Sequence, residues 1–271
     1  MSLRIQTNIE AYDAHRNLVG TQKQLATAME RLSSGFRINR AADDAAGLAI
    51  SEKLASQIGG LNQASRNAQD AVSLVQTGEG ALAEVQSMLQ RVRDLAVQFN
   101  NGTLSKSDQA AITSEVAQLC AEISDIGKQT SFNGINLLNG SSAITFQVGA
   151  NDGESMTVSA VKLFGSGASY QVSSSLFSFS GTVSLSSIDT AIQNVSNSRS
   201  TFGSVQNRLD HRLNNIATYQ ENLQASESRV KDVDMASEMV NFTKLQILNQ
   251  AGTSMLAQAN SAPQSVLSLL R

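Results

Sequence analysis

The chain has 271 residues, of which 4% are aromatic and 16% are charged, and none is tryptophan. Such a composition, rich in Ala, Ser, Leu and Val, argues against a compact globule filled by aromatic rings and favours long helices packed side by side. The net charge of −3 gives no electrostatic case for binding nucleic acid, and the single cysteine, Cys120, excludes an intrachain disulfide and a cysteine metal cluster.

The start of the chain carries a narrow amphipathic pattern. Residues 1–8 lack the apolar run of roughly 7 to 15 residues that a cleaved signal peptide needs, so we expect any export to use another route. Leu18, Leu25 and Leu32 then recur every seven residues, which is typical of a helix with one apolar seam.

A much longer helix is predicted between residues 54 and 99. Apolar residues recur at intervals of seven from Leu54 to Ala96, with a second series between them. Such a helix would be roughly 65 Å long. Gly78 and Gly80 are its weak point and mark a candidate bend, because glycine costs about 1 kcal/mol against alanine inside a helix.

A second helix should follow the next turn and fold back on the first. Ser105 and Asp108 have the spacing of a capping box, and the apolar residues from Ile112 to Ile126 alternate in steps of four and three. Cys120 falls on or beside this stripe, so we interpret it as a packing residue.

The apolar period changes to two around residues 142–162. Ile144, Phe146 and Val148 alternate with polar residues, and so do Met156 and Val158 after a polar stretch with two glycines, which predicts a β-hairpin. The polar stretch is not a calcium loop, because a valine occupies the first ligand position. Residues 165–187 are a short variable Ser-rich segment, which predicts irregular strands or a surface loop that could carry O-linked sugars.

The third long helix has the most regular pattern. From Ile188 to Val230 apolar residues stand at strict intervals of seven. Three amphipathic helices need one another's apolar stripes. The predicted fold class is therefore mainly α: a long antiparallel helical bundle or coiled coil with a small β-hairpin subdomain.

The end of the chain repeats the narrow pattern of its start. Val240, Ile247, Leu248 and Met255 form a looser stripe among Gln, Asn and Ala residues. Alone in water, either end should gain too little burial to offset the entropy lost on ordering it. We therefore assign this stripe, together with the three leucines of the first helix, mainly to contacts completed on assembly with a partner. No stretch is apolar for long enough to span a bilayer, so no membrane partner is expected.

Residues for catalysis or metal binding are sparse. His15 and His211 are the only histidines, they fall on separate helical segments, and no zinc-protease, esterase or P-loop motif occurs. The acidic pairs Asp43-Asp44 and Asp232-x-Asp234 could hold a metal, yet helix N-termini and salt bridges between subunits explain them better. We expect neither enzyme activity nor a cofactor.

Several motifs resemble those of bacterial flagellins and stand in that family's order. They are Leu32–Asn39 with Asp43–Ile50, then Gln90–Gln98, Gln129–Gly134, Asn207–Leu209 and Ser228–Ala236. The resemblance covers about residues 1–160 and 185–271. It implies a structural subunit of the bacterial flagellar filament, which self-assembles through its N- and C-terminal helices into the helical propeller for swimming motility.

The resemblance also implies two domains. Residues 1–42 and 232–271 would form a terminal coiled-coil inner-core domain that orders on assembly. Residues 43–231 would form an outer-core domain of long helices with the hairpin. Only the Ser-rich segment stands where the family usually has large variable domains, so we expect a short form that lacks them.

Partners and location follow from the same resemblance. Members of the family are secreted unfolded through the flagellar export channel, typically after a flagellar export chaperone wraps the C-terminal segment, here Val240–Arg271. The filament is extracellular and meets hook-associated junction and cap proteins.

The resemblance further implies recognition by the vertebrate Toll-like receptor for flagellin. The residues that match the recognised pattern are Gln90, Arg91, Leu95, Gln98 and Glu115. Axial contact between filament subunits is the alternative role of Arg91 and Glu115.

Three other functions stay open. A hook–filament junction protein shares terminal similarity with flagellin, and a secreted helical adhesin or effector and an enzyme are more distant alternatives. The dense match to the flagellin blocks favours the filament protein.

Overall fold

The structure is a computed structural model that describes residues 8–140, 143–165, 171–173, 179 and 183–269. The helices are α1 (Ile9–Ser34), α2 (Ala45–Phe99), α3 (Lys106–Gln129), α4 (Leu185–Lys231) and α5 (Met235–Leu269). The strands are β1 (Ser131–Phe132), β2 (Ile135–Asn136), β3 (Ile144–Gln147), β4 (Ser155–Val158), β5 (Phe164–Gly165) and β6 (Val172–Ser173). The chain splits into a central unit, Gln57–Glu221, and a terminal unit, Met1–Ser56 with Asn222–Arg271, and each is described by itself.

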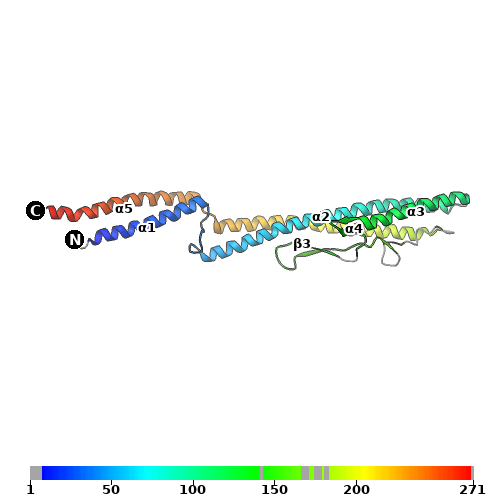
Figure 1. Cartoon of the computed structure of the whole chain (residues 1–271), viewed down its shortest axis with the longest axis horizontal. Helices are drawn as coiled ribbons and strands as arrows, with labels where there is room; N and C mark the ends of the chain where they lie inside the picture. The colour runs from blue at the N-terminus through cyan, green and yellow to red at the C-terminus, as the bar shows by residue number, and fades with distance from the viewer. Residues whose placement is uncertain (1–7, 141–142, 166–170, 174–178, 180–182, 270–271) are drawn as a thin grey trace. The chain divides into compact units, whose positions relative to one another are not determined.

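The central unit is built from three helices whose apolar stripes face one another. In this unit α2, α3 and α4 lie side by side (Figure 1), and the buried side chains form one cluster that begins at Ala68 and ends at Leu209. The positions at intervals of seven supply this core, for example Leu82 and Leu89 on α2 and Val195 on α4. The predicted fold class is thus confirmed.

The two glycines of α2 do not interrupt the helix, which runs without a break from Ala45 to Phe99. A Cβ atom added to Gly78 would lie 2.8 Å from Cε2 of Phe202, whereas one added to Gly80 would meet nothing within 4 Å. Gly78 is therefore a point of close approach between α2 and α4, rather than only the weak point that its helix propensity indicates.

The start of α3 is fixed by the capping box predicted from the sequence. The Asp108 N–H donates to Ser105 Oγ and the Ser105 N–H donates to the Asp108 carboxylate. The Ser105 hydroxyl also donates to this carboxylate, and these bonds hold the pKa of Asp108 below its usual value. The turn before α3 is tied to the start of α4, because the side-chain amide of Asn100 bonds both the N–H and the C=O of Val183.

The predicted hairpin is formed by β3 and β4, which pair antiparallel with Phe146 opposite Met156. Because side chains alternate between the two faces of the hairpin, Val148, Met156 and Val158 are buried in the core. Arg212 of α4 holds the turn, since its Nε donates to the Val148 carbonyl (2.9 Å) and its guanidinium lies 3.6 Å from the Glu154 carboxylate.

Two smaller strand pairs accompany the hairpin, β1 with β2 antiparallel and β5 with β6 parallel. The first of them turns through Asn133 and Gly134, which both have positive φ as in the Asn-Gly turns of two-residue hairpins. Most of the Ser-rich segment 165–187, to which we assigned irregular strands or a surface loop, lies outside the described residues.

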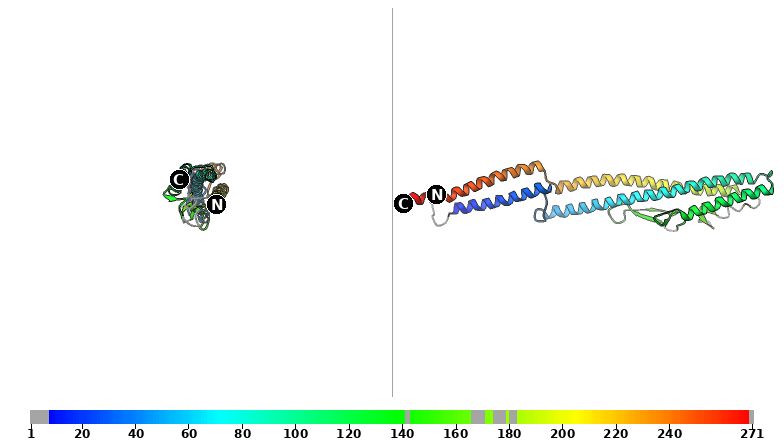
Figure 2. Two further views of the ribbon diagram at one scale, coloured as in Figure 1. Left: turned by 90° about the vertical axis from the view of Figure 1, so that its right-hand side faces the viewer. Right: turned by 45° about the horizontal axis from the view of Figure 1, so that its top comes forward.

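The terminal unit pairs the two ends of the chain. Its helices α1 and α5 lie side by side and run in opposite directions, as Figure 1 and the right-hand view of Figure 2 show. Leu18 and Ala28 of α1 and Leu245 of α5 are buried between them. Gly252 permits the close approach, because a Cβ there would lie 3.1 Å from Cδ1 of Leu18.

Two connectors join these helices to α2 and α4, and within the terminal unit the connectors pair with each other. The Arg37 N–H donates to the Lys231 carbonyl (2.7 Å), and the Val233 N–H donates to the Gly35 carbonyl (3.0 Å). Gly35 ends α1 in the left-handed conformation (φ 76), which favours glycine. Lys231 Nζ lies 4.8 Å from the centroid of the Phe36 ring.

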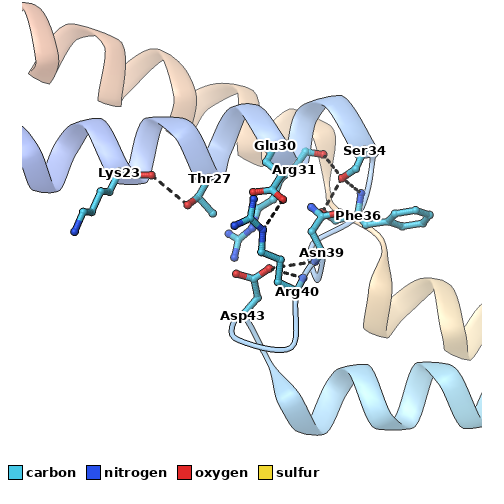
Figure 3. A network of polar contacts seen from close by, with 9 residues as sticks. All are labelled: Lys23, Thr27, Glu30, Arg31, Ser34, Phe36, Asn39, Arg40 and Asp43. Carbon is cyan, nitrogen blue, oxygen red and sulfur yellow. Dashed lines mark hydrogen bonds and ion pairs between the residues drawn. The ribbon is translucent and has the colours of Figure 1, made fainter.

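One residue of each acidic pair caps a helix. Asp44 accepts from the Gly47 N–H at the start of α2, and Asp234 accepts from the Ala236 N–H at the start of α5. Their interpretation as helix N-terminal residues is confirmed at these two positions. Asp43 instead accepts from the backbone N–H groups of Asn39 and Arg40 (Figure 3), and these bonds, first that of Arg40, hold its pKa below the usual value.

Candidate functional site

Exposed apolar side chains are concentrated in the terminal unit. Among the side chains that the structure describes, eleven of the fourteen large hydrophobic residues with high exposure belong to this unit. Its buried apolar side chains are few, whereas the whole core cluster belongs to the central unit. Such a concentration of exposed apolar side chains is typical of a unit that forms protein–protein contacts.

The exposed stripe of α5 is the candidate site. Val240, Ile247, Leu248 and Met255 are all exposed on this helix, with exposed fractions of 71% for Val240 and 65% for Met255. Leu245 of α5 is buried, at 4% exposed, in the pairing with α1. In the α5 stripe, defined by these four exposed residues, the apolar surface has no partner within the described part of the chain.

The three leucines of α1 are placed differently from the α5 stripe. Leu18 is 8% exposed, and Leu25 and Leu32 are half-buried. They lie in the seam between α1 and α5, so each subunit already covers much of their surface. The structure therefore divides the predicted assembly residues into a seam within the chain and a stripe that faces outward.

Two further exposed residues near the start of α1 were not singled out from the sequence. Ile9 and Tyr12 are both exposed and stand three apart, so they lie on one side of the helix. Close by, a cavity of about 330 Å³ opens between the helices, lined by Glu10, Ala14, Met255, Gln258 and Ala259. The spacing of Ile9 and Tyr12 was the available signal, but it is too short to stand out from the longer pattern of the leucines.

A second candidate surface lies on the central unit, where α2 meets α3. The Arg91 guanidinium donates to one oxygen of Glu115 through Nε (2.9 Å) and Nη2 (2.7 Å), and both side chains are about half exposed. Gln90 and Gln98 are exposed on α2 as well. Leu95 is only 1% exposed, so its side chain supports this surface from the core and is not displayed on it.

Arg93 has another partner than its neighbour Arg91. Its Nε donates to Asp189 of α4 at 2.6 Å, and this bond raises the pKa of the guanidinium. The two arginines thus bind the two helices on either side of α2.

The residues that would be considered for catalysis are not gathered into a site. His15 and His211 lie in different units, and no group of three potential metal ligands occurs among the described residues. Burial raises the pKa of the Cys120 thiol, which fits its predicted place in the packing of α3. No helix in the described part of the chain is long and apolar enough to cross a membrane.

Comparison with known proteins decides the family. The profile of the bacterial flagellin N-terminal helical region matches residues 5–143, and that of the C-terminal helical region matches residues 185–270. The chain belongs to the bacterial flagellin family. Flagellins are structural subunits that self-assemble into the flagellar filament, and the recognition of this family from sequence motifs is confirmed.

Individual flagellins match over their whole length. The flagellin of Halalkalibacterium halodurans is 50% identical over 270 residues, covering 98% of this chain and 99% of that protein. The flagellin of Bacillus subtilis is 42% identical over 304 aligned positions, covering 99% and 100%. A candidate flagellar hook-associated protein from Vibrio parahaemolyticus shares the fold, with a TM-score of 0.60 at 16% identity over 70% of this chain and all of that one.

The match also bears on the length of the chain. Polar flagellin C of Vibrio parahaemolyticus aligns over 384 positions with the 271 residues of this flagellin chain, at full coverage of both. The prediction of a short form without large outer domains is therefore confirmed.

Proposed function

We propose that this chain is built into the filament through its terminal unit, with the α5 stripe as the surface that other copies cover. The observation that carries the proposal is the exposure of Val240, Ile247 and Met255 on a helix that is already paired with α1. In this proposal residues 1–42 and 232–271 form the inner core of the filament, and residues 43–231 form its outer core.

Burial of the α5 stripe supplies a driving force for assembly. Covering a fully exposed Val or Ile side chain contributes roughly 1.5–3 kcal/mol, and the same contact recurs at every subunit. A head-to-tail contact that does not close on itself produces an open helical polymer, which is the geometry of a filament.

Charge substitutions in the α5 stripe test this proposal. Val240→Asp and Ile247→Asp place a carboxylate where a neighbour should bury an apolar side chain, so we expect elongation of filament seeds to fall at least tenfold, corresponding to about 1.4 kcal/mol or more. Elongation is measured by electron microscopy of purified monomer added to short filament fragments.

Gln250→Asp is the matched control, because it introduces the same charge on an exposed polar position of α5. It should elongate at nearly the rate of the unmodified chain. All three variants should keep the far-UV circular dichroism of the monomer, since none of these side chains is buried. Normal elongation of Val240→Asp and Ile247→Asp would remove the α5 stripe from the assembly contact.

Export and the other partners belong to the same proposal. The chain travels through the flagellar export channel to an extracellular filament, an export chaperone covers the α5 stripe within residues 240–271 beforehand, and junction and cap proteins meet the filament ends. An exposed apolar helix face is the kind of surface that a groove-forming chaperone binds. The chain is a structural subunit and has no enzymatic role.

Recognition by the Toll-like receptor for flagellin is the second proposed function. The supporting observation is the exposed Arg91–Glu115 pair with Gln90 and Gln98 beside it, since a guanidinium held by two bonds to one carboxylate oxygen offers both charge and a fixed direction to a partner. Leu95 acts from below by holding α2 in place.

A pair of arginine variants tests the receptor proposal. Arg91→Ala should lower the receptor signal of purified monomer about tenfold or more, because rigid arginine contacts are frequent binding hot spots. Arg93→Ala removes the same side chain from the α4 side of α2 and should leave the signal nearly unchanged. Equal signals from the two variants would argue against this surface.

A further inference from the structure

The six methionines among the described residues are divided unevenly between the two units. Met29, Met235, Met239 and Met255 all belong to the terminal unit, and their exposed fractions range from 47% to 65%. Met88 and Met156 belong to the central unit, where the first is half-buried and the second is buried. Every methionine with a strongly exposed side chain among the described residues thus belongs to the unit through which we propose that the chain assembles.

We propose that these four terminal methionines are a peroxide-sensitive modification site, whose oxidation keeps the free chain from entering a filament and from which the assembled filament is shielded. The consequence for assembly rests on the proposed function of the terminal unit. The susceptibility of the four sulfur atoms does not, because it follows from exposure in the free chain.

The reaction needs only a peroxide. The thioether sulfur attacks one oxygen of the peroxide, an S–O bond forms as the O–O bond breaks, and the second oxygen leaves with a proton as water or an alcohol. The sulfur is oxidised by two electrons to the sulfoxide and the peroxide is reduced by two. Methionine sulfoxide reductases reverse the change, one enzyme for each sulfoxide epimer.

The locations of these methionines explain why their oxidation should weaken assembly. Met255 is part of the α5 stripe and lines the cavity between α1 and α5, and Met29, Met235 and Met239 are further exposed apolar side chains of the terminal unit. A sulfoxide oxygen is a strong acceptor, and covering it with an apolar neighbour leaves it without a hydrogen bond, which disfavours the contact. Oxidation also turns a flexible apolar side chain into a polar one.

The thiol of Cys120 is a poor competitor for the oxidant. Cys120 is half-buried on α3, in the central unit, and burial raises the pKa of its thiol. Because the thiolate is the nucleophilic form, a raised pKa slows its reaction with peroxide at neutral pH.

The experiment treats the full-length free chain with hydrogen peroxide and follows two readouts. Peptide mass spectrometry counts the oxygen gained at each methionine, and seeded elongation measures assembly. We expect Met29, Met235, Met239 and Met255 to oxidise before Met88 and Met156, and elongation to fall about tenfold or more while the far-UV circular dichroism of the monomer stays unchanged. Filaments treated in the same way should gain oxygen at these sites more slowly.

The matched control is a variant with all four terminal methionines replaced by leucine, which has nearly the same volume and cannot be oxidised. It keeps Cys120, Met88 and Met156, so it should elongate equally well before and after peroxide. Repair of the oxidised unmodified chain by both reductases should restore elongation and gives a readout without mutation.

Several results would overturn the proposal. If Met88 and Met156 were oxidised as fast as the four terminal methionines, side-chain exposure would not determine which methionines react. Normal elongation of the oxidised chain, or an equal loss in the leucine variant, would remove the link to assembly. If even the untreated chain failed to elongate, the proposed function and the effect of oxidation on assembly would both be wrong. The order in which the methionines are oxidised in the free chain would still test the modification site.

Discussion

At the scale of single residues, Gly78 and Gly80 stand only two residues apart in α2 but have different surroundings. Gly78 faces the Phe202 ring, which is buried, and Gly80 faces open space. Helix propensity treats the two positions alike, at about 1 kcal/mol in favour of alanine. The contact with Phe202 should therefore reverse the effect of an alanine substitution on stability at Gly78, but not at Gly80.

The matched pair of alanine substitutions makes this a measurable difference. Gly78→Ala forces the Phe202 ring to move and should lower the free energy of unfolding of the central unit by about 1–3 kcal/mol. Gly80→Ala should raise it by up to about 1 kcal/mol. Denaturant unfolding followed by far-UV circular dichroism measures both changes. Stabilisation of similar size by both substitutions would mean that Phe202 yields without cost.

At the scale of elements, the connector between α1 and α2 is organised by a carboxylate. Asp43 accepts the N–H groups of Asn39 and Arg40, and Arg40 also pairs with Glu30 of α1 at 3.0 Å (Figure 3). Because the folded-state pKa of Asp43 is lowered from 3.8, its contribution to stability is present above about that pH and is lost as the pH falls through the lowered value.

The connector should consequently be held at neutral pH and loosen only in acid. We expect the Asp43 carboxyl to titrate below 3.8 in nuclear magnetic resonance spectra, and the amides of Asn39 and Arg40 to lose protection from exchange below that midpoint. Asp43→Asn should expose the same two amides at neutral pH. Asp13→Asn removes an equal charge from exposed surface of α1 and should leave them protected; a midpoint at or above 3.8 would contradict the assignment.

The sequence alone was sufficient to predict the elements that have a local or single-faced pattern. Strict intervals of seven predicted α2 and α4, the change to a period of two predicted the β3–β4 hairpin, and Ser105 with Asp108 predicted a helix start. Each of these patterns is local, or reflects one buried face. The Asn-Gly turn between β1 and β2 carried an equally local signal that we did not use.

The sequence was not sufficient where burial depends on which helices cover a surface. Leu95 and Arg91 are one turn apart, yet Leu95 is buried and Arg91 is exposed, because α2 is covered by both α3 and α4 and its buried face is wider than one seam. For the same reason the leucines of α1 and the α5 stripe looked alike as patterns. Only the pairing of α1 with α5 separates a seam within the chain from a surface that faces outward.

At the scale of the whole molecule, the two units differ in how much of their apolar surface the chain itself can cover. The central unit has three helices and a hairpin around one core, and this core holds the largest fully buried side chains apart from Ile216 near its end. The terminal unit has one seam between two helices and a long exposed stripe. Helices stabilised by a single narrow contact open more readily than those in a shared core.

Hydrogen exchange of the free chain should show this difference directly. In dilute monomer, backbone amides before about Ser34 and after about Asp234 should exchange quickly, whereas those between Ala68 and Leu209 that lie in α2, α3 and α4 should exchange slowly, because their opening requires exposure of the common core. Mass spectrometry of peptides after timed labelling resolves the segments. In filaments the amides of α1 and α5 should become protected, since neighbouring copies then cover the α5 stripe. Slow exchange along the entire monomer would mean that the seam between α1 and α5 suffices without neighbours, and the ends would then have no free energy left to gain from ordering on assembly.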